Sequence, residues 1–402
     1  MDLECTMDEQ DVVVLDTGSG YLKVGFSGED APRAVLPTVI TTMTIDRTRE
    51  EESALGDSTT QAKTKDFFGD KALQHFGQAN AKVTRPVLRG EIQEVQLASS
   101  AYKDALENLW DHTFRNVLGI EQEELPILIA DPLPLGQSTY AARQWVAEVM
   151  FERFKMKSLA IFNTAVLSLF STGRTRGLVV ESGEGLTQAV PVFEGYAIPH
   201  AINRINLAGA DITAKVQKMM ETAAVGAEYA TNPQVMEALK ERVCAVALDA
   251  DSVTNGHDTA DQEAKSFELP DGTVIQIGAD IRMGAPEILF GGGESVQKIC
   301  IDSIETCDVD LRQDLLRQCV VAGGTSMLPG LAPRLKKELV KLLPKEVAGI
   351  MDVCADSQRR YAAWIGGSMF ASLSTFDVVA ISRQEWEDGK GDARSLVARK
   401  TF

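Results

Sequence analysis

The chain has 402 residues, of which 44% are apolar, 24% charged and 6% aromatic, as in ordinary folded proteins. This composition excludes a disordered or fibrous chain, and the length favours two or more lobes, each with its own core. Forty Lys and Arg residues against 58 Asp and Glu residues give a formal charge of −18, which repels nucleic-acid phosphates and anionic membranes. We therefore expect no nucleic-acid or membrane partner.

Two glycine-rich segments each follow a short run of apolar residues, in different parts of the chain. The first is DTGSG (residues 16–20) and the second is ESGEG (residues 181–185). Each is flanked by residues of high strand propensity on both sides, which is typical of a β-hairpin with a glycine-rich turn. Both have the order acidic residue, hydroxyl residue, Gly, any residue, Gly. We therefore predict a duplicated α/β domain.

The segments between and after these hairpins show helical periodicity. It predicts helices over residues 102–117, 141–154, 208–220, 233–247 and 331–343. An Asp-Gly hairpin is predicted over 267–275, a Gly-Gly turn follows an apolar strand at 323–324, and polar loops are predicted at 41–65 and 250–264.

Glycine-rich turns suit anion binding because no side chain blocks the approach of a phosphate to the backbone N–H groups. Near the first turn, Lys23 could place a cation over a β-phosphate, and Asp16 could hold Mg²⁺ through water. Either turn alone is explained as well by an ordinary hairpin. Two copies one domain apart favour a site that clamps one polyphosphate.

Five segments together resemble the actin and actin-related protein family: LDTGSG (15–20), DAPRAV (30–35), STGRT (171–175), WIGGS (364–368) and RKTF (399–402). The resemblance covers nearly the whole chain and is weakest at 41–65, 91–100 and 250–264. It implies the α/β actin fold, in which two duplicated ribonuclease-H-like domains hold ATP or ADP and Mg²⁺ (or Ca²⁺) in the cleft between them.

The same resemblance implies four subdomains. Residues 1–37, 68–170 and 362–402 would form the first large subdomain, and residues 38–67 the small one attached to it. Residues 171–207 and 294–361 would form the second large subdomain, and residues 208–293 its small one.

The nucleotide contacts implied by the resemblance come from both hairpins and three later segments. They are Gly18, Ser19, Gly20, Tyr21, Lys23, Gly183, Glu184, Gly185, Lys240, Glu241, Gly324, Thr325, Met327, Arg360 and Tyr361. Lys240 and Glu241 would lie at the ribose and base, and Arg360 replaces the family's usual lysine. Asp16 and Glu181 would hold the metal through water.

Four departures from the family pattern concern hydrolysis. Glu181 and Glu184 replace aspartates, and Gln188 replaces a histidine. Thr164 stands where the family has the glutamine that positions the attacking water, with Asn163 beside it. Hydrolysis requires a water held in line with the γ-phosphate. We therefore expect at most a weak actin-type ATPase, unless Asn163 or Gln188 substitutes for the missing group.

The resemblance also places a partner-binding groove between the subdomains. Its apolar lining would consist of Phe170, Thr175, Ile365, Met369, Phe370 and Leu373. Other actin-like subunits or complex partners would bind there. By contrast, the loop after Phe290 is GGGE (291–294) and carries no apolar plug, and the 41–65 loop is polar, so filament contacts would be weakened.

These features lead to an expected role in protein–protein assembly, as a centractin-like or dynactin-like component of a short filament or complex. The amino-terminal residues lack the pattern of a secretory signal, so a cytoplasmic, cytoskeletal location is expected. The alternative is a nuclear actin-related subunit of a chromatin-remodelling complex that uses ATP structurally. A sugar kinase or Hsp70-type chaperone shares the duplicated fold, but the motifs outside the turns disfavour it.

Overall fold

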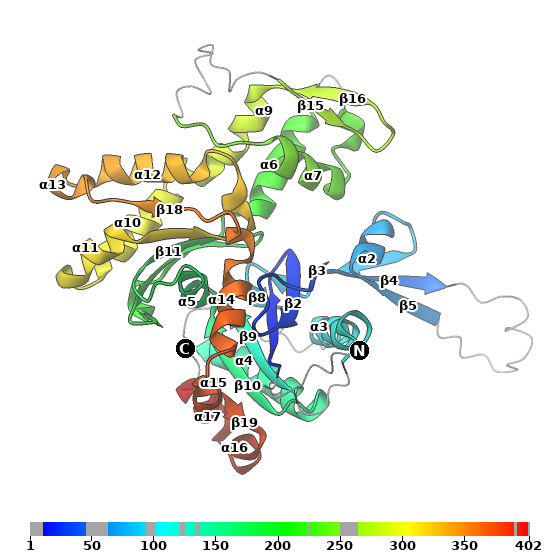
Figure 1. Ribbon diagram of the computed structural model, residues 1–402. Helices are drawn as coiled ribbons and strands as arrows, with labels where there is room; N and C mark the ends of the chain where they lie inside the picture. Colours follow the sequence, from blue (N-terminus) through cyan, green and yellow to red (C-terminus); the bar gives the residue numbers. More distant parts are fainter. Residues whose placement is uncertain are drawn as a thin grey trace, which may run out of the picture.

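The computed structural model describes residues 11–45, 63–93, 101–120, 125–132, 137–223, 226–249, 264–389 and 392–400. Within these residues the chain forms two large mixed sheets (Figure 1). The first runs in the order β19 (Ile381–Ser382), β10 (Ser158–Asn163), β9 (Pro126–Asp131), β1 (Val13–Thr17), β2 (Tyr21–Phe26), β3 (Ala34–Pro37). The second runs β13 (Tyr196–Ala197), β12 (Thr187–Phe193), β11 (Gly177–Ser182), β17 (Cys319–Ala322), β18 (Val353–Cys354), with β14 (Asn203–Ile205) also paired to β12.

The two sheets repeat one topology. Strand β1 is antiparallel to β2 and parallel to β9, and β11 is likewise antiparallel to β12 and parallel to β17. The turns close in the same way, since the Gly18 N–H donates to the Tyr21 carbonyl at 3.1 Å and the Gly183 N–H to the Leu186 carbonyl at 3.0 Å. The duplicated α/β domain predicted from the sequence is confirmed.

Two helices, α5 (Thr164–Phe170) and α14 (Ala362–Ala371), pack between the sheets (Figure 1). Leu167 and Trp364 face the first sheet, whereas Ala165 and Leu169 face the second. A Cβ atom at Gly366 would lie 1.8 Å from the Leu167 carbonyl oxygen. The close approach of the two helices therefore requires glycine at position 366.

The outer faces of the sheets are also covered by helices. Helices α3 (Ala101–His112) and α4 (Gln137–Glu148) cover the first sheet. Helices α10 (Val296–Thr306), α11 (Val309–Arg317) and α12 (Leu331–Leu342) cover the second. Alternate side chains of the central strands pack into cores on opposite faces of each sheet, so these strands are apolar except near their ends, as expected for strands buried on both faces.

A smaller structural unit is attached to each of the two large sheets and its covering helices. The first has a three-stranded sheet, β5 (Lys63–Phe68), β4 (Ile40–Ile45) and β6 (Ala81–Thr84), with helix α2 (Asp70–Gln74). The second contains α6 (Gly209–Met220), α7 (Pro233–Val243), the hairpin β15 (Lys265–Glu268) and β16 (Val274–Ile277), and α9 (Ala279–Gly284). The remaining strands and α-helices of the described residues are β7 (Val87–Leu88), β8 (Glu91–Ile92), α13 (Lys345–Ala348), α15 (Phe376–Val379), α16 (Arg383–Asp388) and α17 (Ala393–Arg399).

Several boundaries differ from the sequence-based expectations. Helices α3 and α4 each continue as a π-helical turn, over Thr113–Leu118 and Val149–Arg153. Helix α7 ends at residue 243, not 247, because Cys244 is extended. The 41–65 segment begins and ends in strands, and β6 places residues up to 84 in the small sheet, beyond the expected limit at 67.

Parts of the two predicted polar loops, residues 46–62 and 250–263, lie outside the described residues. Across the parts of the chain that the structure describes, no helix combines the length and apolar character needed to cross a membrane.

Candidate functional site

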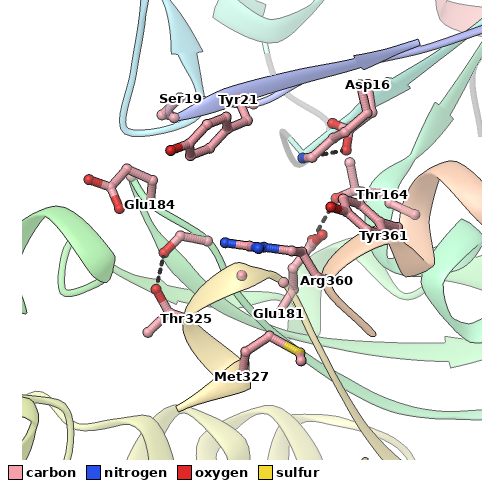
Figure 2. A pocket seen from close by; sticks show the side chains of 18 of the residues that line it. Asp16, Ser19, Tyr21, Thr164, Glu181, Glu184, Thr325, Met327, Arg360 and Tyr361 are labelled. Atoms are coloured by element: carbon pink, nitrogen blue, oxygen red, sulfur yellow. Dashed lines mark hydrogen bonds and ion pairs between the residues drawn. The ribbon is translucent and has the colours of Figure 1, made fainter. Parts of the chain in front are cut away.

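A cavity of about 390 Å³ lies between the two glycine-rich hairpins, a volume typical of small-molecule and cofactor sites. Figure 2 shows Ser19 and Tyr21 on one wall and Thr325 and Met327 on the opposite wall, with Glu184 at one side. The cavity is therefore built by both halves of the duplicated fold.

The structure places the predicted nucleotide contacts around this one cavity. Its lining includes Gly18, Ser19, Gly20, Tyr21, Lys23, Gly183, Glu184, Gly185, Lys240, Glu241, Gly324, Thr325, Met327, Arg360 and Tyr361, together with Asp16, Thr164 and Glu181. Gln188 instead lies behind the wall and is 1% exposed. Gly90, Leu186, Glu237 and Arg359 also line the cavity and were not predicted.

In the first hairpin an acidic and a basic residue stand side by side. Asp16 is directly opposite Lys23 in the β1–β2 register, and the Lys23 Nζ donates to Asp16 Oδ2 at 2.8 Å. Both side chains are largely buried. The Lys23 ammonium group is therefore held at a fixed place beside the turn, where it can neutralise a phosphate.

In the second hairpin the corresponding pair is Glu181 and Gln188, directly opposite each other in the β11–β12 register. The Gln188 side-chain amide donates to Glu181 Oε2 at 2.8 Å, and the Thr164 hydroxyl donates to the same oxygen at 2.6 Å. Glu181 is half-buried, and burial raises the pKa of its carboxyl although both hydrogen bonds oppose that shift. An amide thus occupies the position where the first hairpin has its lysine.

Glu184 lies at the tip of the second turn and lines the cavity at one side. Lys240 Nζ donates to Glu184 Oε2 at 3.0 Å and to the Gly209 carbonyl at 3.2 Å. A Cβ atom at Gly20 would lie 2.9 Å from Glu184 Cβ, so the two turns are in contact. Burial raises the pKa of Glu184 despite the neighbouring ammonium group.

A family model described as Actin matches residues 7–402. The chain belongs to the actin family. The match covers both sheets, both small units and both hairpins of this actin-family chain, and proteins of the family generally bind ATP or ADP with a divalent metal.

The residues present fit a nucleotide and a water-bound cation. Two glycine-rich turns and a fixed lysine face the cavity, and the carboxyl groups of Asp16 and Glu181 line its end. Among the described residues no cluster of three or more His, Cys, Asp or Glu side chains could hold a metal directly. A cation here would depend on phosphate oxygens and water, as Mg²⁺ commonly does.

One arginine joins the two halves of this actin-family chain beside the cavity. Arg89, in the β7–β8 turn, donates to both carboxylate oxygens of Asp211 at 2.5 and 2.8 Å and to the Gly185 and Asn206 carbonyls at 3.0 Å. The adjacent Gly90 N–H donates to the Ser19 hydroxyl at 2.9 Å. The two glycine-rich turns are thus tied to each other at their outer side.

The residues of the predicted partner groove lie near the carboxyl end of α5, whereas its first residue, Thr164, lines the cavity. Phe370 is anchored against Phe162 and Phe170, with ring centroids 4.4 and 5.9 Å away. Met369 and Leu373 are 42% and 44% exposed, Thr175 is exposed, and Ile365 and Phe170 are half-buried. Part of the strip therefore packs inside, and part is accessible to a partner.

We expect Glu181→Gln to change how stability depends on pH. The folded-state pKa of Glu181 is raised, so its contribution to stability is present below the ordinary carboxyl pKa near 4.5 and is lost as pH rises through the folded-state value. Thermal melting without nucleotide should give similar midpoints for variant and natural chain at pH 5, and a variant higher by a few degrees at pH 8. Glu268→Gln, at an exposed position, is the control. If the melting midpoints of Glu181→Gln and of the natural chain change with pH in the same way, the prediction is contradicted.

Proposed function

We propose that this actin-family chain binds ATP or ADP with Mg²⁺ or Ca²⁺ between its two hairpins and acts through assembly with other proteins, while it hydrolyses ATP slowly or not at all. The bound cation would neutralise phosphate charge. The backbone of the two turns and Lys23 would hold the phosphates, and Asp16 and Glu181 would hold the cation through water. Lys240, Glu241, Arg360 and Tyr361 would contact the ribose and base.

The observation that carries the proposal is the hydrogen bonding of Glu181. Thr164 and Gln188 stand at the two positions that would orient the attacking water, and both donate to the same carboxylate oxygen. The single hydroxyl proton of Thr164 is thereby used. Asn163 is no substitute, because its side-chain oxygen accepts the Ala165 N–H at 2.9 Å and caps α5.

Assembly through the groove is supported by the exposed Met369 and Leu373. Filament contacts are disfavoured at the loop after η6 (Pro286–Leu289), because Phe290 is 6% exposed beneath the Arg334 guanidinium and residues 291–294 present only glycines and a glutamate. A cytoplasmic, cytoskeletal role in a short filament or complex, as in centractin, fits this combination.

The test is to follow phosphate release and sedimentation together, with purified chain and Mg-ATP over a concentration series and filament actin in parallel. We expect soluble or weakly pelleting protein that retains unhydrolysed ATP. Phosphate release as fast as that of filament actin would contradict the proposal, and protein that binds no nucleotide would contradict its first part.

A second candidate role is a nuclear actin-related subunit of a chromatin-remodelling complex. The exposed glycine-rich loop at 291–294 favours it, because an isolated subunit needs no apolar contact there. Fractionation of cells into nucleus and cytoplasm distinguishes the two roles. Recovery with chromatin would favour the second, and recovery in the cytoplasm the first.

A further inference from the structure

The hydroxyl group of Thr325 is bonded to the backbone of the second glycine-rich turn. It donates to the Gly183 carbonyl at 2.7 Å, a bond drawn as a dashed line in Figure 2, and the Gly209 N–H donates to the same carbonyl at 3.0 Å. Thr325 is 7% exposed, and its single hydroxyl proton is used in this bond. Although Thr325 lines the cavity, its hydroxyl can therefore donate to the turn and not to a ligand.

The peptide group that joins Gly183 to Glu184 has this bond on one side and an N–H donor on the other. The peptide is trans, so its N–H points opposite to its carbonyl. Because Figure 2 shows Thr325 and Ser19 on opposite walls of the cavity, the Glu184 N–H points away from Thr325 toward the wall that carries Ser19. Throughout the part of the chain that the structure describes, this N–H donates to no protein acceptor. It is a backbone donor of the kind that binds phosphate oxygens.

We propose, on the basis of the proposed nucleotide binding, that Thr325 is a positioning residue for the phosphates. Its hydroxyl fixes the orientation of the Gly183–Glu184 peptide and thereby aims the Glu184 N–H at the phosphates. Glycine-rich backbone has many accessible conformations, so a turn without this bond would have to be ordered by the ligand. A donor that is fixed beforehand removes that cost from binding. The bond therefore strengthens the binding of phosphates whatever group is attached to them.

The helical turn that carries Thr325, η7 (Gly324–Met327), is itself held from both sides. Gly323 has a φ of +88°, and a Cβ atom there would lie 2.3 Å from a carbonyl oxygen of the second hairpin. The Ser326 hydroxyl donates to the Gly323 carbonyl at 2.6 Å, and the Arg359 guanidinium donates to the Ser326 carbonyl at 3.0 and 3.3 Å. These contacts do not involve the Thr325 hydroxyl, so a variant that lacks it should keep the shape of η7.

Binding of etheno-ATP with Mg²⁺ to the full chain, followed by fluorescence, tests this role. Thr325→Val removes the hydroxyl and leaves the Gly183 carbonyl bonded to the Gly209 N–H. We expect the Kd of etheno-ATP to rise about three- to tenfold, the effect of one neutral hydrogen bond. Thr325→Ser keeps the hydroxyl and should stay within twofold of the natural chain.

Thr172→Val is the matched control. The Thr172 hydroxyl also donates to a backbone carbonyl at 2.7 Å, that of Leu169, but Thr172 is not among the residues that line the cavity. This variant should leave the Kd of etheno-ATP unchanged. Thermal melting checks that each variant is folded, and Thr325→Ala, which also lacks the hydroxyl, should show at least the same loss as Thr325→Val.

Displacement of etheno-ATP by magnesium tripolyphosphate separates positioning from a direct contact with the nucleoside. Tripolyphosphate has neither base nor ribose, so Thr325→Val should raise its dissociation constant by the same factor as that of etheno-ATP. If only the binding of etheno-ATP is weakened, Thr325 contacts the base or ribose directly and the positioning role is overturned. The role is also overturned if tripolyphosphate displaces no etheno-ATP from the natural chain, because the turns then do not bind phosphates by themselves.

Two further outcomes contradict the positioning role. Unchanged binding of etheno-ATP by Thr325→Val would show that the turn needs no support from the hydroxyl. An equal loss in Thr325→Ser would show that the hydroxyl is not the group that matters. A natural chain that binds no etheno-ATP at all would instead overturn the proposed function.

Discussion

A variant that carries Thr164→Gln, Glu181→Asp and Gln188→His should hydrolyse bound ATP about 100-fold faster than the natural chain, the scale on which a positioned proton acceptor acts. These are the residues that the family resemblance gives for the three positions. Glutamine at 164 would extend further into the cavity than threonine. Aspartate at 181 is one methylene shorter than the glutamate whose Oε2 now accepts both hydrogen bonds.

Single-turnover phosphate release with enzyme in excess measures this change. Glu181→Asp alone is the matched control, because it withdraws the carboxylate from Thr164 and Gln188 without adding a group that can orient water. We expect that control to stay within a few fold of the natural chain. A triple variant no faster than the control would show that positions 164 and 188 do not limit hydrolysis.

Gly366→Ala should destabilise the fold by about 3 kcal/mol or more, at the upper end for an overpacked core. The added Cβ would lie 1.8 Å from the Leu167 carbonyl oxygen and 2.5 Å from its carbonyl carbon. These are backbone atoms, which no change of rotamer can move. Helix α14 cannot shift easily either, because the Trp364 indole N–H donates to the Val14 carbonyl at 3.0 Å and its ring is fully buried.

Urea or thermal unfolding in the absence of nucleotide measures this loss. Gly349→Ala provides the matched control, since its φ is −72° and a Cβ atom there would meet nothing within 4 Å. We expect the control to change the unfolding free energy by less than about 0.5 kcal/mol. Equal midpoints for the two variants would mean that α5 and α14 separate at little cost.

Features set by nearby residues were predictable from the sequence. The two hairpins were found because each is a strand, a glycine-rich turn and a strand in immediate succession. The same local logic could have paired Glu181 with Gln188, because a turn over 183–186 places these residues opposite each other. Glu237 could also have been found, since it precedes the predicted Glu241 by one helical turn.

Other features depend on contacts distant in sequence. Arg89 joins Asp211 across 122 positions, and nothing around either residue indicates the pairing. The π-helical turn after α3 holds Phe114, which is buried edge-on against Phe154 at 5.2 Å. Tertiary packing thus changes the helix geometry there, and periodicity alone predicts only a continuous helix.

Helix α5 begins at Thr164, which lines the cavity, and ends at Phe170, beside the predicted partner groove. Its seven residues span roughly 10 Å at 1.5 Å per residue, short enough to tilt as one rigid rod. A tilt that follows Glu181 at one end must displace Phe170 and, through ring contact, Phe370 at the other. If both the cavity and the apolar strip bind ligands, reciprocity requires each ligand to alter the affinity of the other by the same factor.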